Sequence, residues 1–145
     1  MKDHVEYFEN GKVKVIGELV DFVKHGKWIY YFEDGQKEKE EVYHKGKLHG
    51  TFRRWSSEGV LMVESEYKEG KRCGSAKEYY KNGTLKEIGK YDDSGQYWPI
   101  HFWDERGLQI LKNGTGSKIE KFGISGLEVF RQFYENGHFV KEERL

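Results

Sequence analysis

Residues 26–50 read GKWIYYFEDGQKEKEEVYHKGKLHG, in which two strand-like segments alternate with two turn signals. The first segment, GKWIYYF, ends at the turn EDGQ, and the second runs to Val42-Tyr43 before the turn HKGKLHG. Aromatic and β-branched residues favour strands, whereas Gly, Asn and Asp favour the turns between them. This stretch therefore predicts an antiparallel β-hairpin followed by a turn that leads into the next strand.

The same pattern recurs along the chain with a period of 24 residues. The glycine columns are Gly11, Gly35, Gly59, Gly83 and Gly107, and Gly26, Gly50 and Gly74; the aromatic columns are Tyr7, Tyr31, Trp55, Tyr79 and Trp103, and Tyr43, Tyr67 and Tyr91. Repeats of this kind stack on their neighbours to build a shared core. We therefore predict an all-β fold, a single curved antiparallel sheet of tandem 24-residue β-hairpin repeats.

Residues 1–145 are predicted to form a single repeat domain. The repeats are expected at about 5–26, 27–50, 51–74, 75–98 and 99–122, with an atypical C-terminal cap at about 112–145. Phe133-Tyr134-Glu135-Asn136-Gly137 copies the start of a repeat but arrives about six residues late, and the first unit has Phe22 where a glycine is expected. Atypical terminal units are typical of repeat arrays, which must cap both ends.

The sequence also predicts the turn conformations. The pairs suited to a tight hairpin are Asn10-Gly11, Asp34-Gly35, Asn82-Gly83 and Asn136-Gly137. Asn, Asp and Gly all tolerate the positive φ that such turns need. Glu58-Gly59 and Arg106-Gly107 keep only the glycine, which indicates a turn with one left-handed residue.

Alternation within the strands predicts two unlike faces. Leu61 is expected to share a face with Tyr67, and Leu85 with Tyr91, because residues two apart in a strand point the same way. The alternating positions are charged, as in Glu64. We therefore expect one apolar and one solvated face, as in an antiparallel meander.

Composition limits the classes of partner. Lys+Arg and Asp+Glu are both 25, so no net charge attracts nucleic acid or an anionic membrane. An aromatic fraction of 16% beside 34% charged residues argues for a folded chain with a core of wide rings. The single cysteine, Cys73, fits a reducing compartment. No apolar run suggests a signal peptide or a membrane span, so we expect a cytoplasmic protein without stable membrane insertion.

No metal or cofactor site is predicted. His25, His49 and Cys73 occupy one repeat column. Neighbours in a column are separated by a whole hairpin, about 10 Å, whereas the ligands of one zinc ion lie within about 4 Å of each other. His44 and His49 flank one turn and can approach each other, but two ligands are too few.

No catalytic constellation is predicted either, so we expect a protein that is not an enzyme. Glu40 and Glu41 are adjacent in a strand and point to opposite faces. Asp92-Asp93 precedes Ser94-Gly95 and is explained by turn chemistry. The alternative, an enzyme acting on a small molecule at the inserted tail, requires a polar pocket near residues 112–126.

Positions at which the repeats disagree are candidates for partner contacts, because a scaffold position should repeat whereas a contact need not. Tyr, Trp and Arg are enriched at interface hot spots. The candidate partner-binding residues are Trp28, Tyr30, Phe52, Arg53, Arg54, Glu78, Trp98, His101 and Trp103. The alternative is that these residues have core or solvated roles.

Three segments resemble the MORN repeat in its second, bacterial variant: YYFEDG (30–35), YKEGKRCG (67–74) and YYKNGTLKE (79–87). The resemblance covers roughly residues 5–110 and, more loosely, the tail. FWDERG (102–107) followed by LKNGTG (111–116) is similar to the way stand-alone bacterial members of this family end.

This resemblance implies an antitoxin or immunity protein whose partner is a cognate protein toxin. The alternative that it implies is a repeat scaffold or a membrane-associated protein-interaction module. An open sheet has two unpaired edges, so edge pairing with a second copy of the chain or with a partner is equally allowed.

Overall fold

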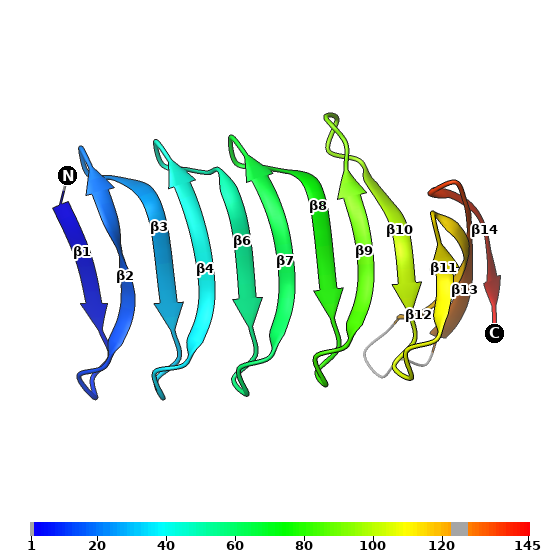
Figure 1. The fold of residues 1–145 in the computed structure, drawn as a ribbon, viewed down its shortest axis with the longest axis horizontal. Helices are drawn as coiled ribbons and strands as arrows, with labels where there is room; N and C mark the ends of the chain where they lie inside the picture. Colours follow the sequence, from blue (N-terminus) through cyan, green and yellow to red (C-terminus); the bar gives the residue numbers. More distant parts are fainter. Residues whose placement is uncertain (1, 123–127) are drawn as a thin grey trace.

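The computed structural model describes residues 2–122 and 128–145 and forms one open antiparallel sheet (Figure 1). The strands are β1 Lys2–Tyr7, β2 Val13–Val20, β3 Val23–Tyr31, β4 Lys37–His44, β5 Lys47–Leu48, β6 Gly50–Trp55, β7 Leu61–Lys68, β8 Lys71–Tyr79, β9 Leu85–Tyr91, β10 Tyr97–Trp103, β11 Gln109–Lys112, β12 Thr115–Phe122, β13 Glu128–Glu135 and β14 His138–Arg144. Strands make up 69% of the structure, and the described residues contain no helix.

The sheet follows the order of the chain. Each strand pairs with the next along the sequence, except that the short β5 pairs only with β4 and lets β4 pair with β6. β1 and β14 are the two edges of the sheet. The predicted fold class, a single antiparallel sheet of tandem hairpins, is confirmed.

The tight turns at one end of the strands each contain one left-handed residue, a glycine. Gly35 has a φ of +96°, whereas Asp34 before it is not left-handed. The Asp34 side chain instead accepts a 2.8 Å hydrogen bond from the backbone N–H of Gln36. Asn10 and Asn82 accept the equivalent bond. The expectation of positive φ at these Asn and Asp residues is wrong, because their side chains close the turn; it is right for Asn136.

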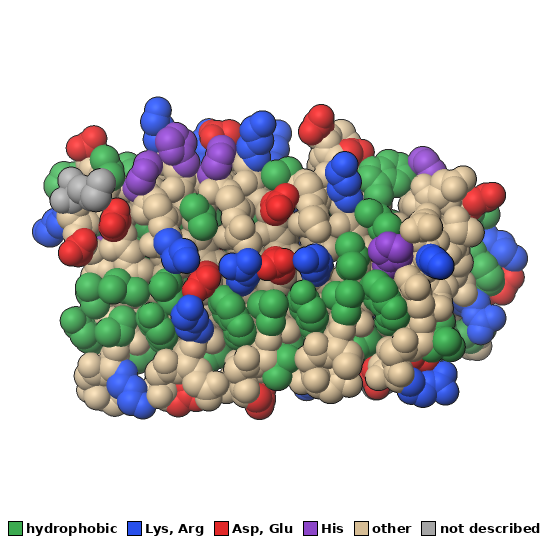
Figure 2. Space-filling view, viewed as in Figure 1, with side chains coloured by type: hydrophobic (Ala, Val, Ile, Leu, Met, Phe, Trp, Pro, Cys, Tyr) green, Lys and Arg blue, Asp and Glu red, His purple; other side chains and the backbone are tan. Residues whose placement is uncertain are grey.

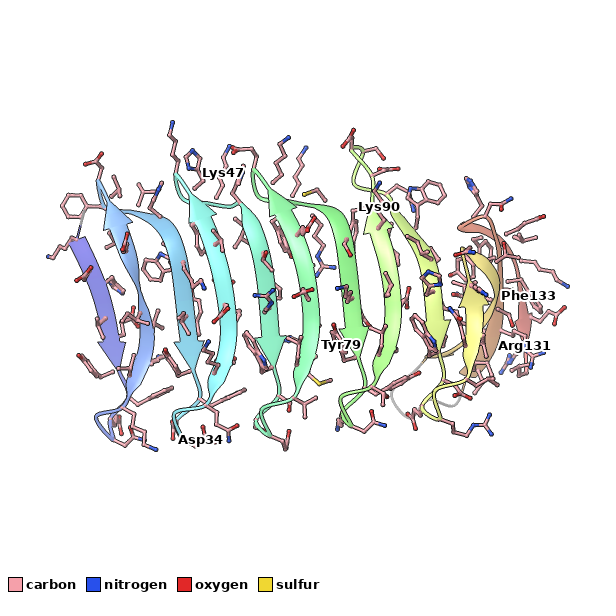
Figure 3. All side chains as sticks on the ribbon, in the orientation of Figure 1. Asp34, Lys47, Tyr79, Lys90, Arg131 and Phe133 are labelled. Atoms are coloured by element: carbon pink, nitrogen blue, oxygen red, sulfur yellow. The ribbon has the colours of Figure 1, made fainter. Side chains whose placement is uncertain are left out.

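At the opposite ends of the strands, most turns contain two consecutive left-handed residues, as at Lys45-Gly46 and Glu69-Gly70, whereas the turn between β9 and β10 has only Gly95. Figure 3 labels Asp34 near the strand ends with the tight turns, and Lys47 and Lys90 near the opposite strand ends. In the first unit this turn is made by Asp21 and Phe22, with Phe22 at a φ of +63°. Left-handed backbone costs an L-residue about 1–2 kcal/mol relative to glycine.

Phe22→Gly is therefore expected to raise the free energy of unfolding by about 1 kcal/mol. The ring is 94% exposed, so no packing is lost with it. For a domain of this size the melting temperature should rise by about 2–4 °C, measured by circular dichroism. Phe22→Ala is the matched control, since it removes the ring but keeps the strained Cβ. An equal rise in both variants would show that the ring, and not the backbone, is responsible.

Each hairpin carries a bulge next to its tight turn, and this bulge sets the two faces. Cross-strand partners share a face, so Arg54 lies with Val63, and Trp55 with Leu61. Met62 is the extra residue between these pairs. Leu61 and Tyr67 therefore lie on opposite faces, as do Leu85 and Tyr91. The expected division into one apolar and one solvated face is wrong, because the bulge shifts the alternation by one residue.

We name the faces after Trp28 and Ile29, neighbours in β3 that point to opposite sides. The Trp28 face carries Val15, Trp28, Tyr30, Glu41, Phe52, Arg54, Ser65, Glu78, Glu87, Phe102 and Leu111. The Ile29 face carries Ile16, Ile29, Glu40, Arg53, Trp55, Glu64, Lys77, Ile88, His101 and Trp103. The buried apolar residues, Val15, Trp28, Phe102 and Leu111, all lie on the Trp28 face, so the core sits there.

The C-terminal strands depart from the regular repeat. β11 and β12 form a hairpin through Asn113-Gly114. A Cβ at Gly114 would overlap the backbone of Gly137, so the two turns pack glycine to glycine. In Figure 1 the strands from β11 to β14 are turned more edge-on than those before them. Residues 123–127 of the predicted cap lie outside the described residues.

Candidate functional site

Trp28 anchors an aromatic cluster on the N-terminal half of the Trp28 face. The ring is 2% exposed, and its Nε1 donates a 3.2 Å hydrogen bond to the backbone carbonyl of Glu18. The Lys24 ammonium lies 4.3 Å from the Trp28 ring centroid and donates to the Tyr30 hydroxyl at 2.6 Å. This cluster combines a packed ring with cation–π contacts and presents Tyr30 beside it.

Glu41 completes the cluster as a buried carboxylate. Burial alone would raise its pKa, but hydrogen bonds from Lys39, Tyr43 and Tyr30 outweigh burial and hold the pKa below its usual value. Burial, together with the neighbouring Glu41, raises the pKa of Tyr43 to about 12. The carboxylate is thus charged and fully engaged, and it is not available to a partner.

A hollow of about 490 Å³ lies farther along the Trp28 face, over β7, β8 and β9. Ser65, Ala76 and Gly89 are cross-strand neighbours in a row that crosses it. Ala76 occupies the repeat position that Phe52 and Trp28 fill in the two preceding units. The hollow therefore exists because this unit lacks the large ring.

Ser65 introduces an unusual polar group beneath the hollow. Its side chain is 2% exposed, and its Oγ has no hydrogen-bond partner among the described residues. Buried hydroxyl groups are nearly always hydrogen-bonded, since an unmade bond costs about 1–3 kcal/mol. The site thus has an unsatisfied donor and acceptor beside the hollow.

Two guanidinium groups, those of Arg54 and Arg72, line the same hollow. Arg72 donates hydrogen bonds to the hydroxyl groups of Tyr67 at 3.0 Å and Tyr91 at 2.8 Å, which raise the pKa of its guanidinium. Neither arginine forms an ion pair with a carboxylate in the described part of the chain, whereas Glu78 on the same wall pairs with Lys86 at 3.3 Å. The hollow therefore carries uncompensated positive charge.

Glu87, Lys118 and Tyr97 close the C-terminal end of the hollow. Lys118 Nζ lies 3.5 Å from Glu87 Oε2, and both side chains are at most 10% exposed. The Tyr97 hydroxyl donates to Glu87 Oε1 at 2.7 Å, and burial next to this carboxylate raises the pKa of Tyr97. Because β10 and β11 separate Glu87 from Lys118 in the sheet, the contact requires the sheet to curl toward the Trp28 face.

The Ile29 face is organised differently, in two parallel rows. Figure 2 shows a row in which blue and red side chains alternate, beside a green band that runs along the sheet. The charged row contains Glu40, Arg53, Glu64 and Lys77, each the cross-strand partner of the next. Arg53 Nε donates to Glu64 Oε2 at 2.7 Å, which with Lys77 lowers the pKa of Glu64.

The predicted contact residues do not form one surface. Trp28, Tyr30, Phe52, Arg54 and Glu78 lie on the Trp28 face, whereas Arg53, His101 and Trp103 lie on the Ile29 face. Trp98 packs against the His138 ring with a 4.5 Å centroid distance, where the C-terminal strands meet β10. Its Nε1 donates to Asp92, whose pKa is lowered to about 2, mainly by the Ser94 hydroxyl and this indole.

The histidines at the strand ends opposite the tight turns form a row that the repeat column does not predict. The ring centroids of His25 and His44 are 5.4 Å apart, and those of His44 and His49 are 5.7 Å apart. The predicted approach of His44 to His49 is confirmed; His44 also reaches His25. Within residues 2–122 and 128–145, no group of three donors could hold a metal ion, and Cys73 is a free thiol.

Sequence reasoning missed Ser65, Arg72, Tyr97, Glu87 and Lys118. The candidate contact residues all come from the first strand of each unit. One column of the second strands varies as much between repeats as the first-strand columns do. It consists of Gly17, Glu41, Ser65 and Gly89, and Ser65 lines the hollow. No sequence signal pairs Glu87 with Lys118, because their contact depends on the curl of the sheet.

The comparisons agree with this repeat geometry. The model of the MORN repeat variant family matches residues 3–21, 24–45, 48–69 and 72–96, more than half of the chain. The chain belongs to this family. MORN repeats are generally protein- or membrane-interaction repeats, which fits the open faces described above. No curated protein matches this MORN repeat protein. None of the described elements is a helix long and apolar enough to cross a bilayer.

Proposed function

We propose that this MORN repeat protein is an antitoxin or immunity protein that neutralises a cognate bacterial toxin by direct contact. The observation that carries the proposal is the hollow of the Trp28 face, where Arg54 and Arg72 have no carboxylate partner within the part of the chain that the structure describes. Arginine and tyrosine are the residues that most often dominate binding energy, and an acidic side chain of the toxin would supply the missing charge. The role is binding and not catalysis.

The form of the sheet supports this mode of action. The hairpins are held by backbone pairing along their whole length, so the Trp28 face is preformed. A preformed surface loses little conformational entropy on association, which leaves more of the contact energy for affinity. Phe52, Arg54 and Glu78, predicted as contacts from the sequence, all belong to this part of the face.

The test is co-purification with the protein encoded next to this gene, together with rescue of cells that express that protein. The double variant Arg54→Glu, Arg72→Glu should weaken binding at least about 100-fold, since it sets like charges against the toxin. Arg106→Glu makes the same kind of substitution once, in an exposed turn outside the hollow, and should bind normally. Rescue by the double variant, or a neighbour that is not toxic, would contradict the proposal. Salt-sensitive sedimentation with anionic vesicles would instead favour the membrane-associated alternative.

A further inference from the structure

The Ile29 face has an order of side chains that is complementary to itself. Consecutive cross-strand partners in its first row are Ile16, Ile29, Glu40, Arg53, Glu64, Lys77, Ile88 and His101. The four charged residues read acid, base, acid, base, with an isoleucine at either end. Read in the opposite direction the order is base, acid, base, acid, so each charge meets its opposite.

A two-fold axis parallel to the strands, lying between β6 and β7, would bring this row onto a reversed copy. Arg53 would then face Glu64 of the second copy, Glu40 would face its Lys77, and Ile29 would face its Ile88. A contact of this kind uses the same patch on both copies, as the interface of a two-fold dimer must.

The second row of the Ile29 face fits the same axis. It consists of the cross-strand pairs Tyr7 with Val13, Tyr31 with Lys37, Trp55 with Leu61, Tyr79 with Leu85, and Trp103 with Gln109. Reversal places Trp55 opposite Leu61 of the second copy, and Tyr31 opposite its Leu85. Each ring meets a smaller side chain, so the large and small side chains of the green band in Figure 2 can interdigitate.

We propose that a second copy of this chain covers the Ile29 face in a face-to-face, two-fold dimer. The charged row can be buried because it is already neutral: Arg53 and Lys77 lie 2.7 and 3.4 Å from Glu64, and Lys37 lies 2.6 Å from Glu40. The two rows from β2 to β10 cover about 35 Å by about 14 Å. They would bury on the order of 1,000 Å² in total, the lower limit for a specific interface, so the dimer is concentration-dependent.

This arrangement differs from pairing through the edge strands and leaves both Trp28 faces outside. Each copy could therefore bind a toxin while dimerised. The inference does not depend on the proposed function, because the two use opposite faces of the sheet.

The test is sedimentation equilibrium of the full chain over a concentration series. The wild-type chain should pass from monomer to dimer as its concentration rises. Arg53→Glu and Glu64→Lys should each weaken the dimer at least about tenfold. In either variant residues 53 and 64 carry the same charge, and the two-fold axis brings them together at two places in the interface. Mixing the two variants should restore a dimer, since the negative row of one then faces the positive row of the other. Circular dichroism of each variant confirms that the sheet is retained.

Arg54→Glu is the matched control: it makes the same charge change one residue away, on the Trp28 face, and should leave the dimer intact. A wild-type chain that stays monomeric throughout would overturn the inference. So would a dimer that is insensitive to Arg53→Glu, which would indicate edge pairing. Failure of the mixed variants to associate would equally exclude the face-to-face arrangement.

Discussion

Replacing Trp28 with alanine is expected to lower the free energy of unfolding by about 3–5 kcal/mol. The indole is almost fully buried, although the sheet is a single layer. Gly17 makes this possible, because a Cβ at that position would overlap the ring. Truncation would remove the packing against Gly17, the hydrogen bond to Glu18 and the surface on which Lys24 and Tyr43 rest.

Urea unfolding measures this loss, and Trp28→Phe should recover most of it because a ring remains over Gly17. Tyr7→Ala is the control, since Tyr7 is 62% exposed and should cost at most about 1 kcal/mol. Repeats contact only their neighbours, so hydrogen exchange should accelerate in β1 to β4 and stay slow in β9 to β12. A uniform acceleration along the chain would show that the sheet unfolds as one unit instead.

The repeat explains why the fold could be predicted and why the faces could not. Glycines such as Gly35 mark the hairpin ends in the sequence, so strand order and turn positions follow from the period alone. The bulge residue Met62 has no such mark: it is an apolar residue within an apolar segment. One unmarked residue per hairpin inverts the alternation, which moved Leu61 from the predicted face to the other one.

The candidate site was predictable only in part, for a related reason. Arg54 and Glu78 stood out because the repeats disagree at their positions. Ser65 and Arg72 matter because of what surrounds them, namely a missing ring at Ala76 and hydroxyl groups from a neighbouring strand. Such contacts join different units, so comparison of one column at a time cannot reveal them.

The two faces of the sheet differ in how their charges are balanced. On the Ile29 face Arg53 and Glu64 neutralise each other within the row. On the Trp28 face Glu78 and Glu87 are paired, while Arg54 and Arg72 have no carboxylate partner among the described residues. A neutral, self-complementary face suits a copy of the same chain, whereas an uncompensated positive hollow suits a different, acidic partner.

Glu87→Ala is expected to destabilise the C-terminal half by about 3 kcal/mol. The carboxylate accepts the Tyr97 hydroxyl and lies beside the Lys118 ammonium, and all of these groups are largely buried. Removing it breaks a buried ion pair, and the loss of one partner costs more than the intact pair contributes. The contact also joins β9 to β12 across two strands, so the curl of the sheet should relax.

Glu78→Ala is the matched control, because Glu78 is the cross-strand neighbour of Glu87 but is exposed and should cost less than about 1 kcal/mol. The combined variant Glu87→Gln, Lys118→Met keeps the volume of both side chains and removes both charges. It should recover most of the stability lost in Glu87→Ala, since the buried pair is then replaced by two neutral side chains of similar volume. Equal losses in Glu87→Ala and in the combined variant would show that packing, rather than charge, holds the C-terminal strands against the sheet.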